Sequence, residues 1–110
     1  MKDRKMDERL KRIADHYGYE HQMRKATEEL AECIVAICHL DDERRDKRGR
    51  LSNLLEEIAD VRVILEQVVY LVQQRFEPAY DAARMVRSIE IFKTQRTINR
   101  LDGNEEASEC

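Results

Sequence analysis

Two clusters of carboxylate side chains share one spacing and stand 28 positions apart in this 110-residue chain. They are Glu28, Glu29 and Glu32 in the first cluster and Glu56, Glu57 and Asp60 in the second. Each cluster is flanked by Ile, Val, Leu and Ala, which are typical of a buried helix face. Two unit charges about 4 Å apart repel by roughly 4 kcal/mol at an effective dielectric of 20. Carboxylates beside an apolar face therefore require a compensating positive charge.

An i,i+3 pair from each cluster borders the apolar stripe when the two segments are drawn as helices. The pairs are Glu29 with Glu32 and Glu57 with Asp60. The short charged connector between the segments predicts that they pack antiparallel, so that both pairs converge on one point. Converging carboxylates would supply the hard oxygen ligands that Mg²⁺ and Mn²⁺ prefer. The other two acids, Glu28 and Glu56, point further out.

The acids have two other interpretations. A ferritin-like di-iron site needs Glu-x-x-His, but the residues three positions before the histidines are Ile13, Gly18 and Ala36. Acidic pairs near helix starts also occur as surface charge that complements the helix dipole. Either cluster alone would fit that description, whereas two matching clusters beside apolar runs favour a metal site.

The elements that would position these acids are helices. Three Gly, one Pro and no Trp leave little turn chemistry for a β-rich fold, so we expect one all-α domain over residues 1–101. Four helices are predicted, at about 6–16, 21–42, 52–75 and 78–101. Gly18 and Gly49 are the expected breakers, Ser52 or Asn53 the expected cap of the third helix, and Pro78 the first residue of the fourth.

Charge and cysteine content exclude several classes of protein. Residues 102–110 carry four acids and no base, and are predicted to be a disordered tail, which leaves 20 bases against 19 acids in residues 1–101. That balance argues against a nucleic-acid binder. Residues 1–12 contain no apolar leader, and no apolar run is long enough to span a bilayer, so we expect a cytoplasmic protein without a membrane partner. Cys33 and Cys38 are expected to be buried thiols, without disulfide or zinc spacing.

The paired motif resembles that of the MazG-like nucleoside triphosphate pyrophosphohydrolases. Glu-Glu-x-x-Glu appears at residues 28–32 and Glu-x-x-Asp at residues 57–60. The resemblance extends from YGYEHQMRKATEELAE through LLEEIADVRVILEQV to FKTQRTINRLDG. It implies a four-helix protomer of the all-α NTP pyrophosphatase type that binds Mg²⁺, with Mn²⁺ as a substitute. It also implies hydrolysis of an NTP or dNTP between the α and β phosphates, giving a nucleoside monophosphate and pyrophosphate.

Carried onto this chain, the resemblance implies the metal ligands Glu29, Glu32, Glu57 and Asp60. Glu28 matches the first position of the motif and joins the predicted catalytic set. The resemblance does not identify which nucleotide is the substrate.

Cationic side chains are candidates for binding the triphosphate. They are Lys25, one turn before the first acidic cluster, and the line Lys93, Arg96 and Arg100 in the fourth helical segment. That line is also what a solvated helix face looks like, and the resemblance favours phosphate binding. His21 and Gln22 are candidates for a base pocket, with ordinary helix packing as the alternative.

The helices carry more apolar surface than one short bundle can hide, so we expect helical bundles formed by a homodimer or homotetramer. Another protomer could then complete the nucleotide pocket. Two alternatives to the enzyme stay open: a non-catalytic helical oligomerisation module, and a nucleotide-binding regulator with a degenerate site.

Overall fold

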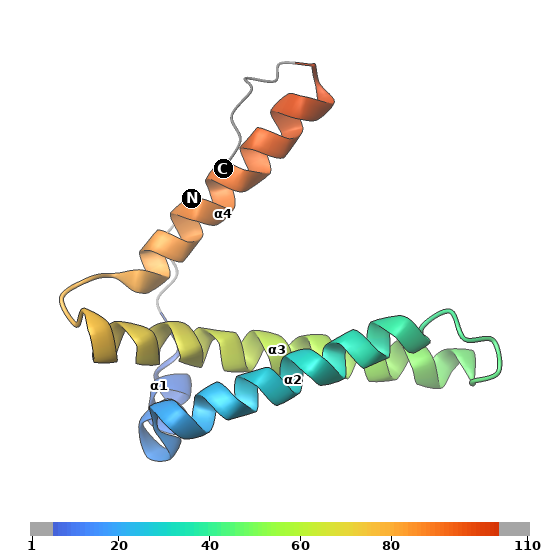
Figure 1. The fold of residues 1–110 in the computed structure, drawn as a ribbon, viewed down its shortest axis with the longest axis horizontal. Helices are drawn as coiled ribbons and strands as arrows, with labels where there is room; N and C mark the ends of the chain where they lie inside the picture. The colour runs from blue at the N-terminus through green and yellow to red at the C-terminus, as the bar shows by residue number, and fades with distance from the viewer. Residues whose placement is uncertain (1–5, 104–110) are drawn as a thin grey trace.

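The computed structural model describes residues 6–103, which form four helices and no strand. The helices are α1 (Glu8–Tyr17), α2 (Tyr19–His39), α3 (Lys47–Phe76) and α4 (Ala82–Leu101). In Figure 1, α2 and α3 lie side by side as a long antiparallel hairpin, α1 packs at one end of it, and α4 leaves from the end of α3. The prediction of an all-α chain with four helices is confirmed. Within residues 6–103, no helix combines the length and hydropathy that a bilayer span requires.

The α1–α2 junction is set by a cap and a glycine. Asp7 caps α1, because its Oδ1 accepts a hydrogen bond of 2.8 Å from the backbone N–H of Arg9. Gly18 ends α1 with a φ of 86°, a conformation that side chains other than that of glycine rarely adopt. The predicted breaker at Gly18 is therefore confirmed, and α2 starts directly after it.

Helix α3 begins earlier than the sequence predicted. Its first residue is Lys47 and its cap is Asp46, whose Oδ2 accepts a hydrogen bond of 2.8 Å from the N–H of Gly49. Gly49 thus lies inside the first turn and does not break the helix. The prediction of a start near Ser52 or Asn53 was wrong because Asp46, six residues before Ser52, supplies the cap.

The start of α4 was also predicted incorrectly. Pro78 lies in the α3–α4 turn, and the helix begins at Ala82 with Asp81 as its cap. Gln73 of α3 closes this turn, since its Oε1 accepts from the N–H of Ala82 at 2.9 Å and its Nε2 donates to the carbonyl of Pro78 at 3.4 Å. The exit direction of α4 is therefore fixed by hydrogen bonds to α3.

Ion pairs fold the α2–α3 connector. Asp42 pairs with Arg44 and Arg45, and these contacts lower the pKa of its carboxyl to about 2. Arg50, in the first turns of α3, donates from Nη1 to the carbonyl oxygen of Leu40 at the end of α2. The connector thus holds the two helix ends together, as the antiparallel prediction required.

The seam between α2 and α3 contains small and polar side chains. Its buried residues include Ala26 and Ala36 of α2 and Ile64 of α3. Gln22 and Gln67 are buried as well, and Gln22 Nε2 donates to Gln67 Oε1 at 2.7 Å. Alanines allow the helix axes to approach closely, and one hydrogen bond joins the two buried amides where they meet.

Replacing Gln67 with Ala is expected to lower the free energy of unfolding by about 1 to 3 kcal/mol. The change would leave the buried amide of Gln22 without its acceptor, which costs the desolvation of that group. Urea denaturation of the variant measures the loss, and Gln74→Ala, at an exposed position two turns further along the same helix, is the matched control. Equal losses in the two variants would contradict this role for Gln67.

The cysteine prediction was wrong in the described chain. Cys38 is exposed and Cys33 is half-buried, and both are free thiols. Cys38 follows the buried Ala36 by two positions, which on a helix places it on nearly the opposite side from the seam. The predicted tail lies outside the described residues from position 104 onward.

Candidate metal centre

Three carboxylates from α2 and α3 meet beside the seam. Glu29, Glu57 and Asp60 each offer one oxygen atom, and these atoms all lie within 4.8 Å of one another. Mg²⁺ binds oxygen ligands at about 2.1 Å, so two oxygens on one ion stand at most about 4.2 Å apart. Small side-chain rotations would therefore bring all three carboxylates onto one cation.

The two halves of the hairpin are aligned so that these acids face each other. Glu29 follows Gln22 by seven residues on α2, and Asp60 precedes Gln67 by seven residues on α3. Seven residues are about two helical turns, so both acids lie about 10 Å along the seam from the bonded amides. The Gln22–Gln67 contact and the acidic cluster thus belong to one continuous interface.

Two carboxylate oxygens of the cluster are buried without a partner. Glu29 is only 7% exposed, and both its Oε2 and the Oε2 of Glu57 are buried and accept no hydrogen bond. An uncompensated buried carboxylate oxygen is costly because it has lost water and gained no donor. The donor set and the missing partners both fit a hard divalent cation placed between the two helices.

The charge of the cluster alters the ionisation of Glu57. Burial, followed by the negative charges of Glu32, Asp60 and Glu29, raises the pKa of Glu57 above its ordinary value of 4.5. Glu32 is exposed and is not one of the three converging residues, yet it lies close enough to act on Glu57. All four predicted ligands therefore share one electrostatic environment, and three of them converge.

Lys25 partly neutralises the cluster. Its Nζ lies 3.1 Å from Oε1 of Glu29, one turn further along α2. The hydrogen bond to Glu29 and the charges of Glu29, Glu28 and Glu32 raise the pKa of Lys25, so the ammonium stays charged. Because Lys25 uses Oε1, the other oxygen of Glu29 is left for a cation.

Replacing Lys25 with Met is expected to lower the thermal midpoint of the metal-free protein and to enlarge the rise that Mg²⁺ produces. The substitution removes the ammonium but keeps the chain length, so repulsion among the carboxylates increases. Thermal melts with and without Mg²⁺ measure both changes. Arg24→Met, the neighbouring exposed cation on α2, is the control, and an identical pattern in it would contradict the prediction.

The remaining predicted residues lie around and away from the cluster. Glu28 is exposed on α2 and points outward, as predicted. Gln22 has the packing role described above, and Nδ1 of the exposed His21 lies 2.7 Å from its Oε1. His21 also stacks on Tyr17, with ring centroids 4.7 Å apart. A base pocket at His21 and Gln22 stays a prediction.

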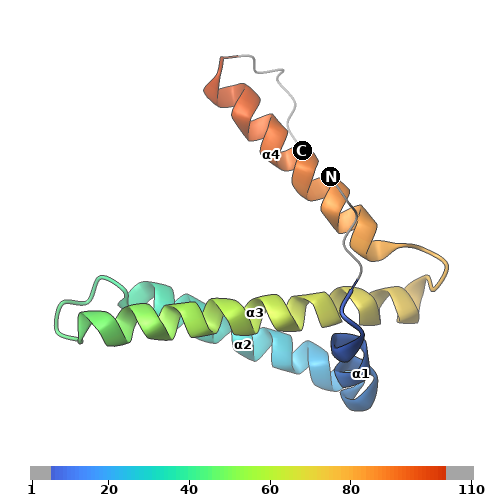
Figure 2. The same cartoon turned by 180° about the vertical axis from the view of Figure 1, so that it is seen from behind.

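The basic line of α4 is not brought to the carboxylates within one chain. Lys93, Arg96 and Arg100 lie on α4, which among the four described helices packs against α3 alone. Figure 2 shows α4 leaving the hairpin at the end opposite the α2–α3 connector. Phosphate binding by these residues beside the cluster would therefore require a second copy of the chain.

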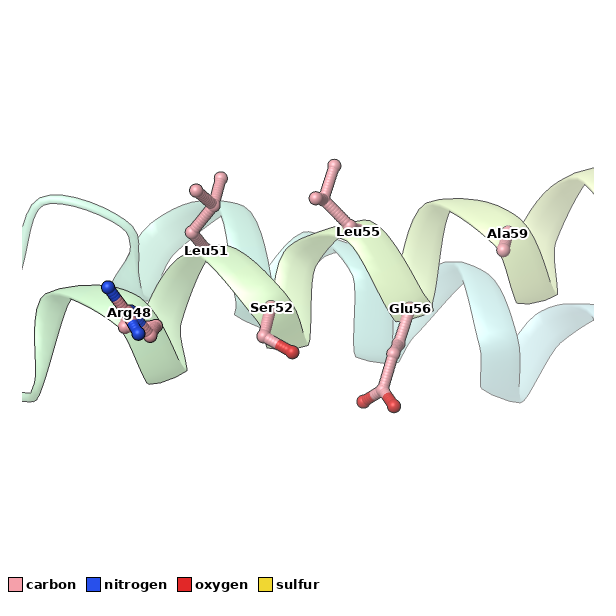
Figure 3. Close-up of a pocket in the computed structure, with 6 residues that line it drawn as sticks. All are labelled: Arg48, Leu51, Ser52, Leu55, Glu56 and Ala59. Carbon is pink, nitrogen blue, oxygen red and sulfur yellow. The ribbon is translucent and has the colours of Figure 1, made fainter.

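A shallow depression of about 450 Å³ lies on the outer side of α3. Its lining residues are Arg48, Leu51, Ser52, Leu55, Glu56 and Ala59. Figure 3 shows Leu51 and Leu55 projecting to one side of the helix while Ser52 and Glu56 project to the other. All six residues come from one helix and none is a converging carboxylate, so this depression is separate from the candidate metal centre.

The sequence interpretation missed Gln67 as a residue that aligns the centre. The available signal was its position seven residues after Asp60, which places both on one side of α3.

Comparison of the chain with protein-family models, with curated proteins and with solved structures finds no match. The function therefore has to be inferred from the paired motif and from the geometry of the carboxylates.

Proposed function

We propose that this protein is a Mg²⁺-dependent nucleoside triphosphate pyrophosphohydrolase of the MazG-like type. The observation that carries the proposal is the convergence of Glu29, Glu57 and Asp60, with two buried carboxylate oxygens that lack a partner. The reaction would cleave an NTP or dNTP between its α and β phosphates and release pyrophosphate. Mn²⁺ is expected to substitute for Mg²⁺, since both take carboxylate oxygens.

The carboxylates would have different roles in the reaction. Glu29, Glu57 and Asp60 would hold the cation, which when bound offsets the negative charge of the phosphate chain. Glu32 lies beside Glu57 but outside the converging three, so it is the candidate to accept a proton from the attacking water. Glu28 faces solvent at the edge of this group and would contribute to its negative field.

Cations would hold the phosphate chain over the carboxylates. Lys25 supports this role, because its ion pair with Glu29 keeps an ammonium beside the carboxylates. We assign Lys93, Arg96 and Arg100 to the same task in an assembly where α4 of a second copy reaches the hairpin. Arg side chains match phosphate oxygens with paired donors, which suits them to a triphosphate.

Pyrophosphate release from a panel of canonical and modified NTPs and dNTPs, with about 5 mM Mg²⁺, tests the proposal. Release from at least one nucleotide, abolished by chelation of the metal, is the expected result. Binding of Mg²⁺ and nucleotide without release would instead favour the nucleotide-binding regulator. No release, together with a thermal midpoint that does not change on addition of Mg²⁺, would favour the non-catalytic oligomerisation module. The exposed apolar side chains of the hairpin would also suit such a module.

A further inference from the structure

A chain of hydrogen bonds runs from an exposed ring on α2 to the backbone of α3. Nδ1 of His21 lies 2.7 Å from Oε1 of Gln22, and Nε2 of Gln22 donates to Oε1 of Gln67 at 2.7 Å. Nε2 of Gln67 then donates to the carbonyl oxygen of Val63 at 3.2 Å. Both amides are buried, and in such surroundings a mismatched donor or acceptor is costly.

The direction of this chain is set at its buried end. The carbonyl oxygen of Val63 can only accept, so the atom of Gln67 that faces it has to be the amide nitrogen. The opposite orientation of that amide would place two oxygen atoms 3.2 Å apart with no proton between them. Gln67 therefore turns its oxygen toward α2.

The same reasoning extends from Gln67 to the imidazole. Oε1 of Gln67 can only accept, so Gln22 faces it with its nitrogen and turns its own oxygen toward His21. That oxygen also can only accept, which requires a proton on Nδ1 of His21. In a neutral imidazole one nitrogen is a donor and the other is an acceptor, and the bond made by one decides the state of the other. The lone pair of His21 is then on Nε2.

A second contact holds the plane of this ring. His21 stacks on Tyr17, with ring centroids 4.7 Å apart and planes 22° from parallel. Figure 1 shows α1 folded against the start of α2, where these two rings meet. A half-turn of the imidazole in this stack would put a carbon atom in the place of Nδ1. The oxygen of Gln22 would then lose its donor, so the chain also selects one of the two ring orientations.

We propose that the carbonyl of Val63, acting through the two buried amides, holds His21 as the Nδ1–H tautomer. Histidine in water favours the other tautomer, with the proton on Nε2, so the chain reverses the intrinsic preference of the ring. Nε2 of His21 becomes a hydrogen-bond acceptor at the corner between α1 and α2. Because both ends of the Gln22 amide are engaged in the chain, a ligand at this corner meets His21 through Nε2 and has to bring an N–H or O–H donor.

Nitrogen NMR of the protein with isotope-labelled histidine tests this inference at about pH 8.5, where imidazole is neutral. Long-range proton–nitrogen correlations show which ring nitrogen carries the proton. His21→Phe keeps an aromatic ring beside Tyr17 and identifies the signals of His21 by their loss. The native protein is expected to show the proton of His21 on Nδ1. His16 and His39, which lie outside the chain, are internal references and should show it mainly on Nε2.

Two substitutions of Gln67 separate an effect of the chain from a local preference of the ring. Gln67→Met removes the acceptor for Gln22, so His21 is expected to return to the proton distribution of the two reference histidines. Gln67→Glu still turns a carboxyl oxygen toward Gln22, so the proton should stay on Nδ1 of His21. Gln74→Met, at an exposed position on the same helix, is the matched control and should leave the tautomer unchanged.

A proton mainly on Nε2 of His21 in the native protein would overturn the inference, and so would a proton that stays on Nδ1 in Gln67→Met. If Gln67→Met fails to fold, the comparison of His21 with His16 and His39 in the native protein still decides the outcome. The inference does not rest on the proposed enzyme. Its readout is the position of one proton, so its failure is distinguishable from a failure to release pyrophosphate.

Discussion

Glu57→Gln is expected to lower pyrophosphate release at least about a hundredfold while making the metal-free protein more stable. Loss of a residue that only supports a metal ligand typically costs 10- to 100-fold in activity, so loss of a ligand should cost at least the upper figure. The stability gain arises because Glu57 sits near Glu32, Asp60 and Glu29, and the amide removes its charge from that group. A residue retained for packing would not combine these two effects.

The stability gain has a defined pH dependence. The folded-state pKa of Glu57 lies above the ordinary 4.5, so as pH rises through 4.5 the unfolded chain releases this proton first. Ionisation then favours unfolding, and the native protein loses stability relative to Glu57→Gln until the folded-state pKa is passed. The difference should be absent below pH 4.5, grow above it, and become constant at higher pH.

Thermal melts of both proteins across this pH range, in chelator, measure that difference. Glu66→Gln, an exposed acid on the same helix, is the control and should change neither activity nor the pH profile. Addition of Mg²⁺ should stabilise the native protein and the control, and fail to stabilise Glu57→Gln. Full activity in Glu57→Gln would refute its assignment as a ligand.

Ile64→Ala is expected to cost about 2 to 5 kcal/mol of unfolding free energy, the usual range for removing most of a buried Ile side chain. Ile64 is 3% exposed and lies on α3 between Asp60 and Gln67, one turn from each. Its removal would open a cavity between the carboxylates and the paired amides. Since domains of this size have only about 5 to 15 kcal/mol in total, the variant should unfold at markedly lower urea.

Val63→Ala is the matched control for this prediction, because Val63 is the preceding residue and is exposed. Its loss should stay below about 1 kcal/mol. Both proteins should be compared at one concentration, since association would shift the apparent stability of each. A loss in Val63→Ala as large as that in Ile64→Ala would mean that the seam is not the core of the hairpin.

The sequence predicted the candidate centre better than the helix boundaries. Matched spacing of the two clusters predicted that Glu29, Glu32, Glu57 and Asp60 converge, and three of them do, because antiparallel packing brings α2 and α3 together there, while Glu32 stays outside the three. The starts at Lys47 and Ala82 depended on which acid captured the first backbone N–H groups. Asp46 and Asp81 accept those hydrogen bonds. Residue propensity alone had favoured Ser52 or Asn53 as the cap of the third helix and Pro78 as the first residue of the fourth.

The position of the basic line could not be predicted from the sequence. Lys93, Arg96 and Arg100 share one side of α4, but their distance from the carboxylates depends on how the α3–α4 turn is built. That turn is closed by the side chain of Gln73, a contact without a sequence signature. The prediction that Cys38 is buried was wrong for a related reason. An apolar run on a helix is buried only where a neighbouring element packs against it.

The bonded Gln22–Gln67 pair has a consequence for how the two helices choose their alignment. A seam lined by alanines and aliphatic side chains could slide by one turn with little loss of apolar contact. Sliding would leave both buried amides against hydrocarbon without their hydrogen bond, which is costly. A single polar pair in an apolar helix interface is known to fix the alignment of the helices in this way. Because the carboxylates sit two turns away on the same helices, the amides dictate which acids meet. The spacing of the candidate metal ligands is thus encoded partly at a distance, in residues that would never touch the cation.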